Sequence, residues 1–475
     1  MTMRLELRQP VVAILTTMLP LGILLAAGTE RPSDEMIWHW VKSALQDDPR
    51  LATVNVGLNV ADGIVTLTGV VENLAEKQYA LREAQKIYGV RGVIEKLYIE
   101  PGYRTDADIK EDVRARLVAS SSIPIRLLGV AVEKGEVTLT GEVRSAAQRE
   151  EDWLLAAEVR GVRAVNNKLV VSPARTRPDS EIQRDILDSL QSDVYLTGLP
   201  ITVSVADGVA TLNGEVGNAS ERLRAGDRAR LVNNVRDVHN TVAIRSWEQR
   251  GVRQGASHPD PLSLEKAVRD ELELDGRIPI ANIWVEAGPR SVTLRGIVPM
   301  LQQKRIAEQD AMNVVGVRSV INRLEVETEW RDDDALVRDV QTSLDSDDLL
   351  NGQDIRVRVR DGLLTLSGTV TSAFQKYHAE EVALRIRGLR ELANAILVDV
   401  SPQFTDTALR LKIKDRLAAH WETHAVADVM EVSVTEGKAT LTGEVNTLAQ
   451  RAEAERVAGL TEGVRSVDNE LAVVR

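Results

Sequence analysis

The sequence predicts an α+β fold: six tandem copies of one small α-β-β-α-β unit, each with a mixed sheet packed by two helices. The first observation behind this is a seven-residue phrase, VTLTGVV at 65–71, which returns five more times with small changes. The second is its regular spacing, because a fixed period of this kind is typical of repeat proteins. The glycines that anchor the six copies are Gly69, Gly141, Gly214, Gly296, Gly368 and Gly443.

A hairpin in the first unit follows from a two-residue periodicity. The segment TVNVGLNV at 53–60 alternates apolar and polar residues, which is typical of a strand with one buried face. Asp62 and Gly63 then supply a turn that favours positive φ, and the repeated phrase becomes the second strand. We expect the odd-numbered residues of 65–71 to face the core.

Two helices and a third strand complete the unit. The segment 73–89 has the length of a helix and ends at a glycine, and an apolar segment at 92–100 follows it as the last strand. Before the hairpin, residues 33–48 predict another helix, with Ser33 and Asp34 as candidate caps.

Three further positions recur at fixed distances after each anchor glycine. Glycine follows after twenty residues in five units, with Asn234 in the third, and asparagine after twenty-six in five units, with Glu95 in the first. Alanine follows after fifteen residues in every unit: Ala84, Ala156, Ala229, Ala311, Ala383 and Ala458. We expect the anchor glycine to leave room for another backbone, and the small alanine to face that gap from the following helix. The second glycine is expected to be a left-handed helix C-cap, and the asparagine to hold a turn before the last strand.

Composition excludes several classes of function. The chain has no cysteine, a formal charge of −12 and only 3% aromatic residues. These values argue against thiol chemistry, nucleic-acid partners and a large cofactor pocket. The sequence contains no phosphate-binding loop and no repeated reactive group, so we expect no catalysis, no cofactor and no metal. His420 and His424 have the spacing of a metal pair, but we interpret them as a chance pair on a solvated helix.

The amino terminus has the layout of a secretory signal peptide. Two arginines precede an uncharged stretch at 11–27, and small residues then offer a cleavage signal. We predict a signal peptide over residues 1–28, with a membrane anchor through 11–27 as the alternative. Either interpretation places the six units outside the cytoplasm, in the periplasm.

The repeated pattern D/E-G-x-x-T-L-x-G-x-V, followed by the alanine and by G-V-x-x-V-x-N-x-L, resembles the BON domain of bacterial envelope proteins. The resemblance covers nearly all of the chain after residue 33. It implies the α-β-β-α-β fold, export, no catalysis and association with anionic phospholipid surfaces. Other members of the family bind potassium or partner proteins. Asn234, Glu95 and the fourth hairpin, EAGPRSV, depart from the pattern and put those local turns in doubt.

The first helix of the sixth unit is the candidate site for lipid. It carries more basic residues than the first helices of the other units, beside an apolar stripe of Leu409, Ile413 and Leu417. A basic helix with an apolar stripe and a tryptophan suits an anionic membrane surface. The alternative is that the stripe packs on its own sheet and the basic residues are solvated. The predicted lipid-binding residues are Arg410, Lys412, Lys414, Arg416 and Trp421.

A long polar segment is expected to act as a hinge between the third and fourth units. The predicted domains are 33–100, 105–172, 178–245, 260–328, 332–401 and 405–475, with a linker at 246–259. The first hypothesis for function is a non-enzymatic exported protein that associates with phospholipid membranes and supports the cell envelope under stress. The alternatives are a periplasmic scaffold that recruits envelope proteins, and the sensing of an ion or a small ligand.

Overall fold

The computed structural model describes residues 32–474, apart from 52–54, 101–103, 121–127, 144, 173–176, 245–259, 289–290, 346, 348 and 400–403. The predicted signal peptide and the predicted linker therefore lie outside the described residues. Part of the divergent fourth hairpin lies outside them too.

Every repeat runs in the order helix, strand, strand, helix, strand, as the sequence predicts. Repeat 1 contains α1 (Asp34–Asp47), β1 (Asn55–Ala61), β2 (Ile64–Val71), α2 (Leu74–Gln85) and β3 (Gly92–Ile99). Repeat 2 contains α3 (Asp106–Ser120), β4 (Leu128–Glu133), β5 (Glu136–Val143), α4 (Ala146–Ala157) and β6 (Ala164–Val171). Repeat 3 contains α5 (Asp179–Ser192), β7 (Ile201–Ala206), β8 (Val209–Val216), α6 (Ala219–Leu231), β9 (Asp237–Asn240) and β10 (Ala243–Ile244).

The second half of the chain repeats this order. Repeat 4 contains α7 (Pro261–Leu274), β11 (Ile283–Ala287), β12 (Ser291–Val298), α8 (Leu301–Met312) and β13 (Ser319–Val326). Repeat 5 contains α9 (Asp333–Asp345), β14 (Asp354–Arg360), β15 (Leu363–Val370), α10 (Ala373–Leu384) and β16 (Glu391–Val398). Repeat 6 contains α11 (Asp406–Ala419), β17 (Met430–Thr435), β18 (Lys438–Val445), α12 (Leu448–Gly459), β19 (Ser466–Asn469) and β20 (Ala472–Val473).

The repeated phrase forms the central strand of each sheet. In repeat 1 the order is β1-β2-β3, with β1 antiparallel and β3 parallel to β2. The parallel pair is connected through α2, as a parallel pair needs a crossover. Val65, Leu67 and Val71 of β2 are buried, which confirms the predicted inward face. Ser33 caps α1 as expected, because its side chain accepts a hydrogen bond from the Met36 amide at 3.2 Å.

The anchor glycines allow a close contact with a different neighbour from the one predicted. All six have φ between 116° and 133°, a conformation that disfavours any side chain. A Cβ at Gly368 would overlap the carbonyl oxygen of Asp354 on the neighbouring strand β14, and Gly214, Gly296 and Gly443 have equivalent neighbours. The tight contact is therefore between two strands of one sheet. The expected contact between strand and helix was wrong for these glycines, because the obstacle lies in the plane of the sheet.

The recurring alanines are core residues. All six are fully buried in the second helix of their repeats. We predict that Ala383→Leu lowers the free energy of unfolding by about 1–3 kcal/mol, because a filled core has no room for three further carbon atoms. Chemical denaturation measures the change. Ala408→Leu, at an exposed position of α11, is the control and should cost less than about 0.5 kcal/mol. Equal effects at both positions would contradict this packing.

The second recurring glycine has the left-handed conformation that the sequence predicts, but its role as a helix C-cap was wrong: the C-cap of α2 is Lys86, and Gly89 lies in the turn that follows. Its φ lies between 88° and 99° in the five repeats that have it, and Asn234 adopts φ 71° at the same position. Asparagine tolerates this region better than most residues. The departure at Asn234 therefore leaves the local turn intact.

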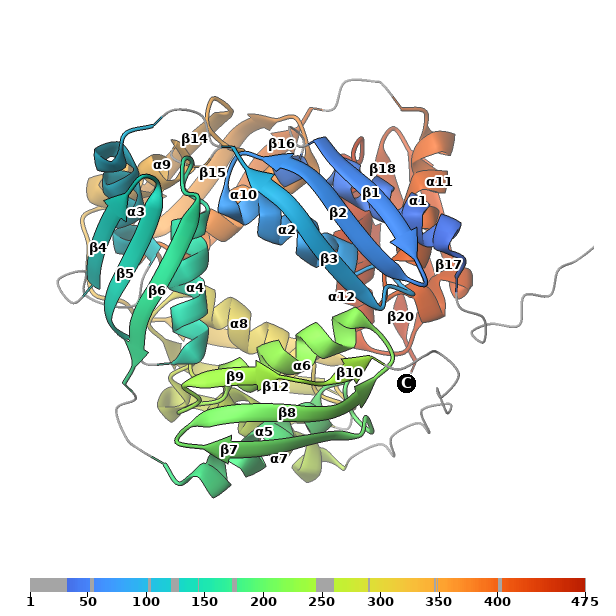
Figure 1. The fold of residues 1–475 in the computed structure, drawn as a ribbon, viewed down its shortest axis with the longest axis horizontal. Helices are drawn as coiled ribbons and strands as arrows, with labels where there is room; N and C mark the ends of the chain where they lie inside the picture. The colour runs from blue at the N-terminus through green and yellow to red at the C-terminus, as the bar shows by residue number, and fades with distance from the viewer. Residues whose placement is uncertain are drawn as a thin grey trace, which may run out of the picture.

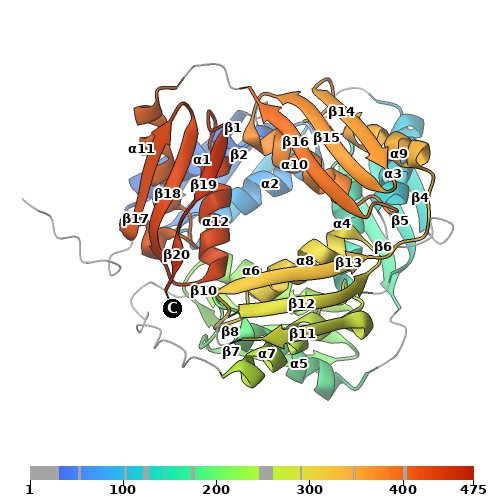
Figure 2. The same ribbon diagram turned by 180° about the vertical axis from the view of Figure 1, so that it is seen from behind.

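The six repeats form a closed ring of two layers (Figures 1 and 2). Repeats 1, 2 and 3 make one layer, and repeats 6, 5 and 4 lie behind them in that order. The first helices of facing repeats meet between the layers, α1 with α11, α3 with α9 and α5 with α7. The second helices surround the centre of the ring, and the sheets cover its two opposite faces, those of repeats 1 to 3 in Figure 1 and those of repeats 4 to 6 in Figure 2.

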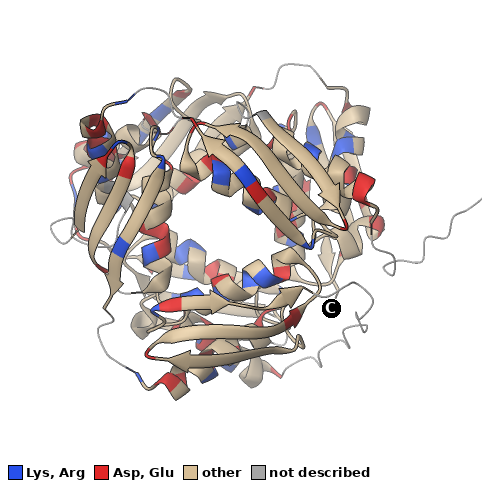
Figure 3. Ribbon diagram, in the orientation of Figure 1, with Lys and Arg blue, Asp and Glu red and all other residues tan. Residues whose placement is uncertain are grey.

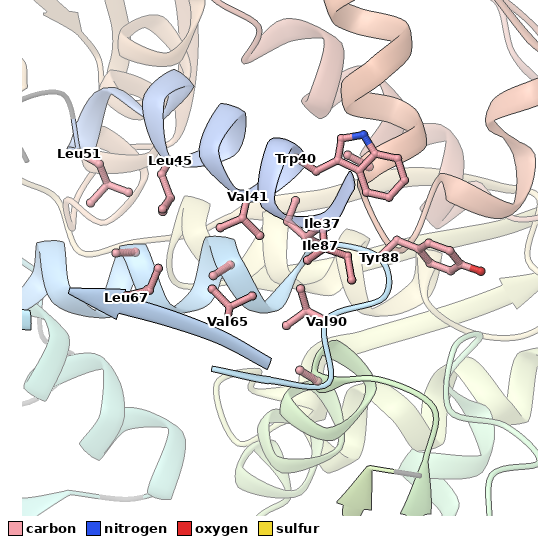
Figure 4. Packing of buried hydrophobic residues seen from close by; sticks show 14 of the residues in the cluster. Ile37, Trp40, Val41, Leu45, Leu51, Val65, Leu67, Ile87, Tyr88 and Val90 are labelled. Carbon is pink, nitrogen blue, oxygen red and sulfur yellow. The ribbon is translucent and has the colours of Figure 1, made fainter. Parts of the chain in front are cut away.

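Backbone hydrogen bonds join the repeats. Between repeats 1 and 6, the Tyr88 amide donates to the Ala419 carbonyl at 2.8 Å. Between repeats 3 and 1, the Ala219 amide donates to the Val90 carbonyl at 3.1 Å, which closes one layer. Ala219 and Ala419 also belong to the hydrophobic core of repeat 1, part of which is shown in Figure 4. The repeats therefore share packing with their neighbours.

The predicted hinge does not separate the two halves. Repeat 3 packs face to face on repeat 4, where Val232 pairs with Asp275 and Asp193 pairs with Val314 in short β-bridges. Arg224 of α6 adds contacts to two other repeats, 3.4 Å from Glu422 and 3.0 Å from Asn313. The expected division at the linker is wrong, because residues far from the linker join the two halves.

Candidate functional site

The predicted lipid-binding helix is α11. Thr405 caps it by accepting a hydrogen bond from the Ala408 amide at 3.2 Å. Leu409, Ile413 and Leu417 are buried, and the last two belong to the core of repeat 6. The apolar stripe therefore packs on its own sheet, as the alternative interpretation expected.

Two of its basic residues make ion pairs with repeat 1. Lys412 Nζ lies 2.8 Å from Asp47 Oδ1, and Arg416 Nη1 lies 3.2 Å from Asp47 Oδ2. Asp47 is buried at the end of α1, and Trp40 of the same helix donates its indole N–H to Asp415 at 3.1 Å. A buried carboxylate needs such partners, because burial without them is costly. Lys412 and Arg416 thus hold the two layers together.

Trp421 also lies between repeats. Its amide donates to the Lys86 carbonyl at 3.1 Å, and its ring packs on that of Tyr195, with centroids 4.9 Å apart. These contacts join repeat 6 to repeats 1 and 3. Of the predicted lipid-binding residues, Lys414 alone is exposed, and Arg410 is partly buried. The structure therefore places Lys412, Arg416 and Trp421 in interfaces, and leaves Arg410 and Lys414 to test this helix as a lipid site.

The histidine pair is not on a solvated helix. The helix ends at Ala419: His420 is its C-cap, and His424 begins a short 3-10 helix after the turn. His420 is buried, with Nε2 3.1 Å from Glu453 Oε1, and His424 stacks on Tyr88 with ring centroids 3.4 Å apart. His420 takes the place of aspartates that end the first helix in repeats 1, 3, 4 and 5. The interpretation as a solvated pair was wrong because the partner repeat covers this turn.

The interface around His420 is expected to weaken in acid. Burial lowers the pKa of His420 from about 6.5 to about 4, and the charge of Arg456 acts in the same direction while Glu453 opposes it. The unfolded chain therefore takes up a proton below about pH 6.5 that the folded chain refuses until about pH 4. Stability from this group is present above pH 6.5 and is lost as the pH falls through that window, by up to ~1.4 kcal/mol per pH unit.

Unfolding of the natural chain and of His420→Gln, followed between pH 7 and pH 4, tests this expectation. Burial also raises the pKa of nearby Glu422 to about 7, so the difference between the two proteins isolates the histidine. The natural chain should lose more stability than the variant on acidification. Parallel pH profiles would contradict a buried neutral imidazole.

The acidic segment at 331–339 has a structural role. Asp333, the first residue of α9, accepts hydrogen bonds from the Asp361 and Gly362 amides at 2.8 and 3.1 Å. Asp34, Asp106, Asp179 and Asp406 bind the hairpin turns of their own repeats in the same way. Repeat 4 has Pro261 at this position, and its hairpin also departs from the common sequence. Sequence reasoning missed this contact, although the recurring aspartate was a usable signal.

The recurring asparagine also has a structural role. Asn394 lies inside β16, donates from Nδ2 to the Lys376 carbonyl of α10 at 2.9 Å and accepts from the Ile396 amide at 3.3 Å. In repeat 1 the place is taken by Glu95, which pairs with Lys77 at 2.8 Å. The expected turn before the strand was wrong, because the asparagine connects the last strand to the second helix.

Two absences hold for the part of the chain that the structure describes. Within these residues, no three or more His, Asp or Glu side chains gather in a way that could hold a metal ion. Nor does any described helix combine the length and the apolar character that crossing a bilayer requires.

The repeated residues thus define a class of protein: a tandem-repeat α+β protein whose recurring side chains build and join its repeats. The chain belongs to the BON domain family, whose domain matches residues 33–101, 105–173, 178–246, 262–328, 332–399 and 405–475. The expected family and fold class are confirmed.

A relative and a solved structure also match the chain. Osmotically-inducible protein Y of Escherichia coli (strain K12) is 32% identical over 143 residues, which are 29% of this chain and 71% of that protein. The solved structure is the C-terminal domain of CdsD, the structural protein of the type III secretion system of Chlamydia trachomatis. The match covers 44% of this chain and 96% of the CdsD chain, at 18% sequence identity. Its TM-score of 0.13 is too low to support a comparison of architecture.

Proposed function

We propose that this chain is a non-enzymatic protein of the periplasm that associates with anionic phospholipid surfaces and supports the cell envelope during osmotic stress. The observation that carries the proposal is the match of six BON domains together with the similarity to an osmotically-inducible protein. The signal-like segment at 1–28 supports export.

The recurring side chains favour a role in binding over one in catalysis. An enzyme with six copies of one unit would be expected to repeat its reactive groups. Glycine, alanine, asparagine and aspartate are among the residues that recur here, and each of these four has a packing or hydrogen-bonding role inside its repeat. The function therefore belongs to the outer surfaces of the ring.

A second candidate is a periplasmic scaffold that recruits envelope proteins. The observation in its favour is the formal charge of −12, which opposes contact with an anionic membrane over most of the surface. Lipid association consequently needs a local cluster of cations.

Sedimentation of residues 29–475 with vesicles tests the two candidates. Neutral vesicles and vesicles that contain phosphatidylglycerol would be compared at low and at moderate salt. Binding that requires the anionic lipid and weakens with salt supports membrane association. Arg410→Glu with Lys414→Glu tests whether α11 contributes. Absence of binding to every vesicle contradicts membrane association and favours the scaffold.

A further inference from the structure

The outer face of the repeat 5 sheet carries a row of arginines. Strand β14 alternates, so Ile355 points into the core while Arg356, Arg358 and Arg360 are exposed on the opposite face. The residues beside Arg356 and Arg358 across the sheet are small: Ser367 and Ala395 in one row, Thr365 and Ala393 in the next. Small neighbours leave the guanidinium groups uncovered.

Two of the three arginines have no acidic partner among the described residues. Arg356 pairs with Asp354 at 3.0 Å and remains 74% exposed, whereas no ion pair is found for Arg358 or Arg360 within that part of the chain. Surface pairs of this kind hold a charge only weakly. All three arginines are therefore available to an external anion.

Repeat 5 differs from the other repeats in this respect. The outward residues of the first strand are Gly57 and Asn59 in repeat 1, and Glu431, Ser433 and Thr435 in repeat 6. In repeat 4 they include Glu286, which pairs with Arg295 at 3.1 Å. Among the described first strands, a row of outward cations is specific to β14.

The row also lies where a large surface can reach it. β14 is an edge strand of the repeat 5 sheet, which lies on the face of the ring that Figure 2 shows. Figure 3 shows that acidic and basic residues are mixed on the helices around the centre. On the repeat 5 face, Leu397 is 70% exposed and Leu363 stands beside Arg360. Arginine bonds phosphate oxygens in a bidentate manner, and exposed leucines suit the boundary between headgroups and acyl chains.

We propose that this face of repeat 5, with Arg356, Arg358 and Arg360, is the surface through which the chain docks on an anionic phospholipid membrane. The proposal rests on the proposed function and assigns the contact to a sheet. The favoured occupant is a lipid surface because the cations, the small flat face and the exposed leucines occur together. An acidic chain needs such a row, since about 1 kcal/mol of attraction is available per basic residue near an anionic surface.

The test uses residues 29–475 with Arg358→Glu and Arg360→Glu together, and vesicles of phosphatidylcholine with and without phosphatidylglycerol. Arg295→Glu with Arg323→Glu is the matched control, because it makes the same change of charge on the outer sheet face of repeat 4. We expect the first variant to lose anionic vesicle binding by more than about tenfold, and the control to retain it. Arg358→Gln with Arg360→Gln should lose less, and circular dichroism confirms folding of each variant.

The outcomes separate the two proposals. Unchanged binding by the repeat 5 variant overturns this site but leaves membrane association in place. Equal losses in the repeat 5 variant and the control also overturn it, because net charge alone would then decide binding. Failure of the natural chain to bind any vesicle overturns both proposals. Inorganic phosphate would also be added as a competitor at matched ionic strength. If it displaces the protein from the vesicles, the arginine row binds a free anion, and the assignment to a lipid surface is overturned.

Discussion

Replacement of Arg228 by methionine is expected to lower the free energy of unfolding by about 3–5 kcal/mol. Arg228 on α6 is 5% exposed and forms an ion pair with Glu271 of repeat 4. Its other nitrogens lie 3.7 Å from Asp193 and 3.8 Å from Asp310. Burial, together with the charge of Asp275, raises the pKa of Asp310 well above its usual range, so this interface already disfavours negative charge. Loss of the guanidinium leaves the buried carboxylate of Glu271 without its cation, whereas Asp193 keeps Arg224 at 2.9 Å.

Equilibrium denaturation measures the effect. Arg230→Met on the same helix is the control, since Arg230 is about one-third exposed and pairs with Asp227 at 3.0 Å on the surface. That variant should cost less than about 1 kcal/mol. Similar losses from both variants would show that Arg228 does not hold repeats 3 and 4 together.

The second large effect is expected at an anchor glycine. Gly368→Ala should destabilise the chain by more than about 3 kcal/mol, because two costs combine. The residue has φ 118°, which an L side chain resists by about 1–3 kcal/mol. Its new Cβ would also overlap the Asp354 carbonyl oxygen, so β14 would have to move away from β15.

Gly352→Ala in the same repeat separates the two costs. Gly352 also has a positive φ, of 78°, but no atom lies within 4 Å of the position that its Cβ would occupy. This control should lose only the conformational part, about 1–2 kcal/mol. Thermal and chemical denaturation of both variants give the comparison. Equal losses would mean that the close approach of the strands has no energetic weight.

The sequence predicts each repeat well, because the information is local. The alternation at 53–60, the turn at Asp62 and Gly63 and the fixed distance to Ala84 all lie within one unit, and the structure has the elements they imply. The recurring aspartate at the start of the first helix was visible in the same way, although its partner in the hairpin turn was not.

The candidate site could not be predicted in the same way, because it depends on contacts between repeats. Lys412 and Asp47 are hundreds of residues apart, and no periodicity within a unit shows that they meet. The basic character of α11 therefore indicated an open surface where the fold forms an interface. The arginine row of β14 was visible as IRVRVR at 355–360. Its alternation also gives the row its position on the outer face.

The closed ring limits how many repeats can act together on a flat surface. The sheets of repeats 1 to 3 cover one face of the ring and those of repeats 4 to 6 cover the opposite face, so a planar bilayer can touch the sheets of one layer only (Figures 1 and 2). Six copies of a domain then do not multiply the avidity as six modules on a flexible string would. The ring can therefore present only one of its two layers to a flat membrane at a time. The sheets of the other layer then face away from that membrane, so one ring has two opposite sheet surfaces that cannot act on the same plane.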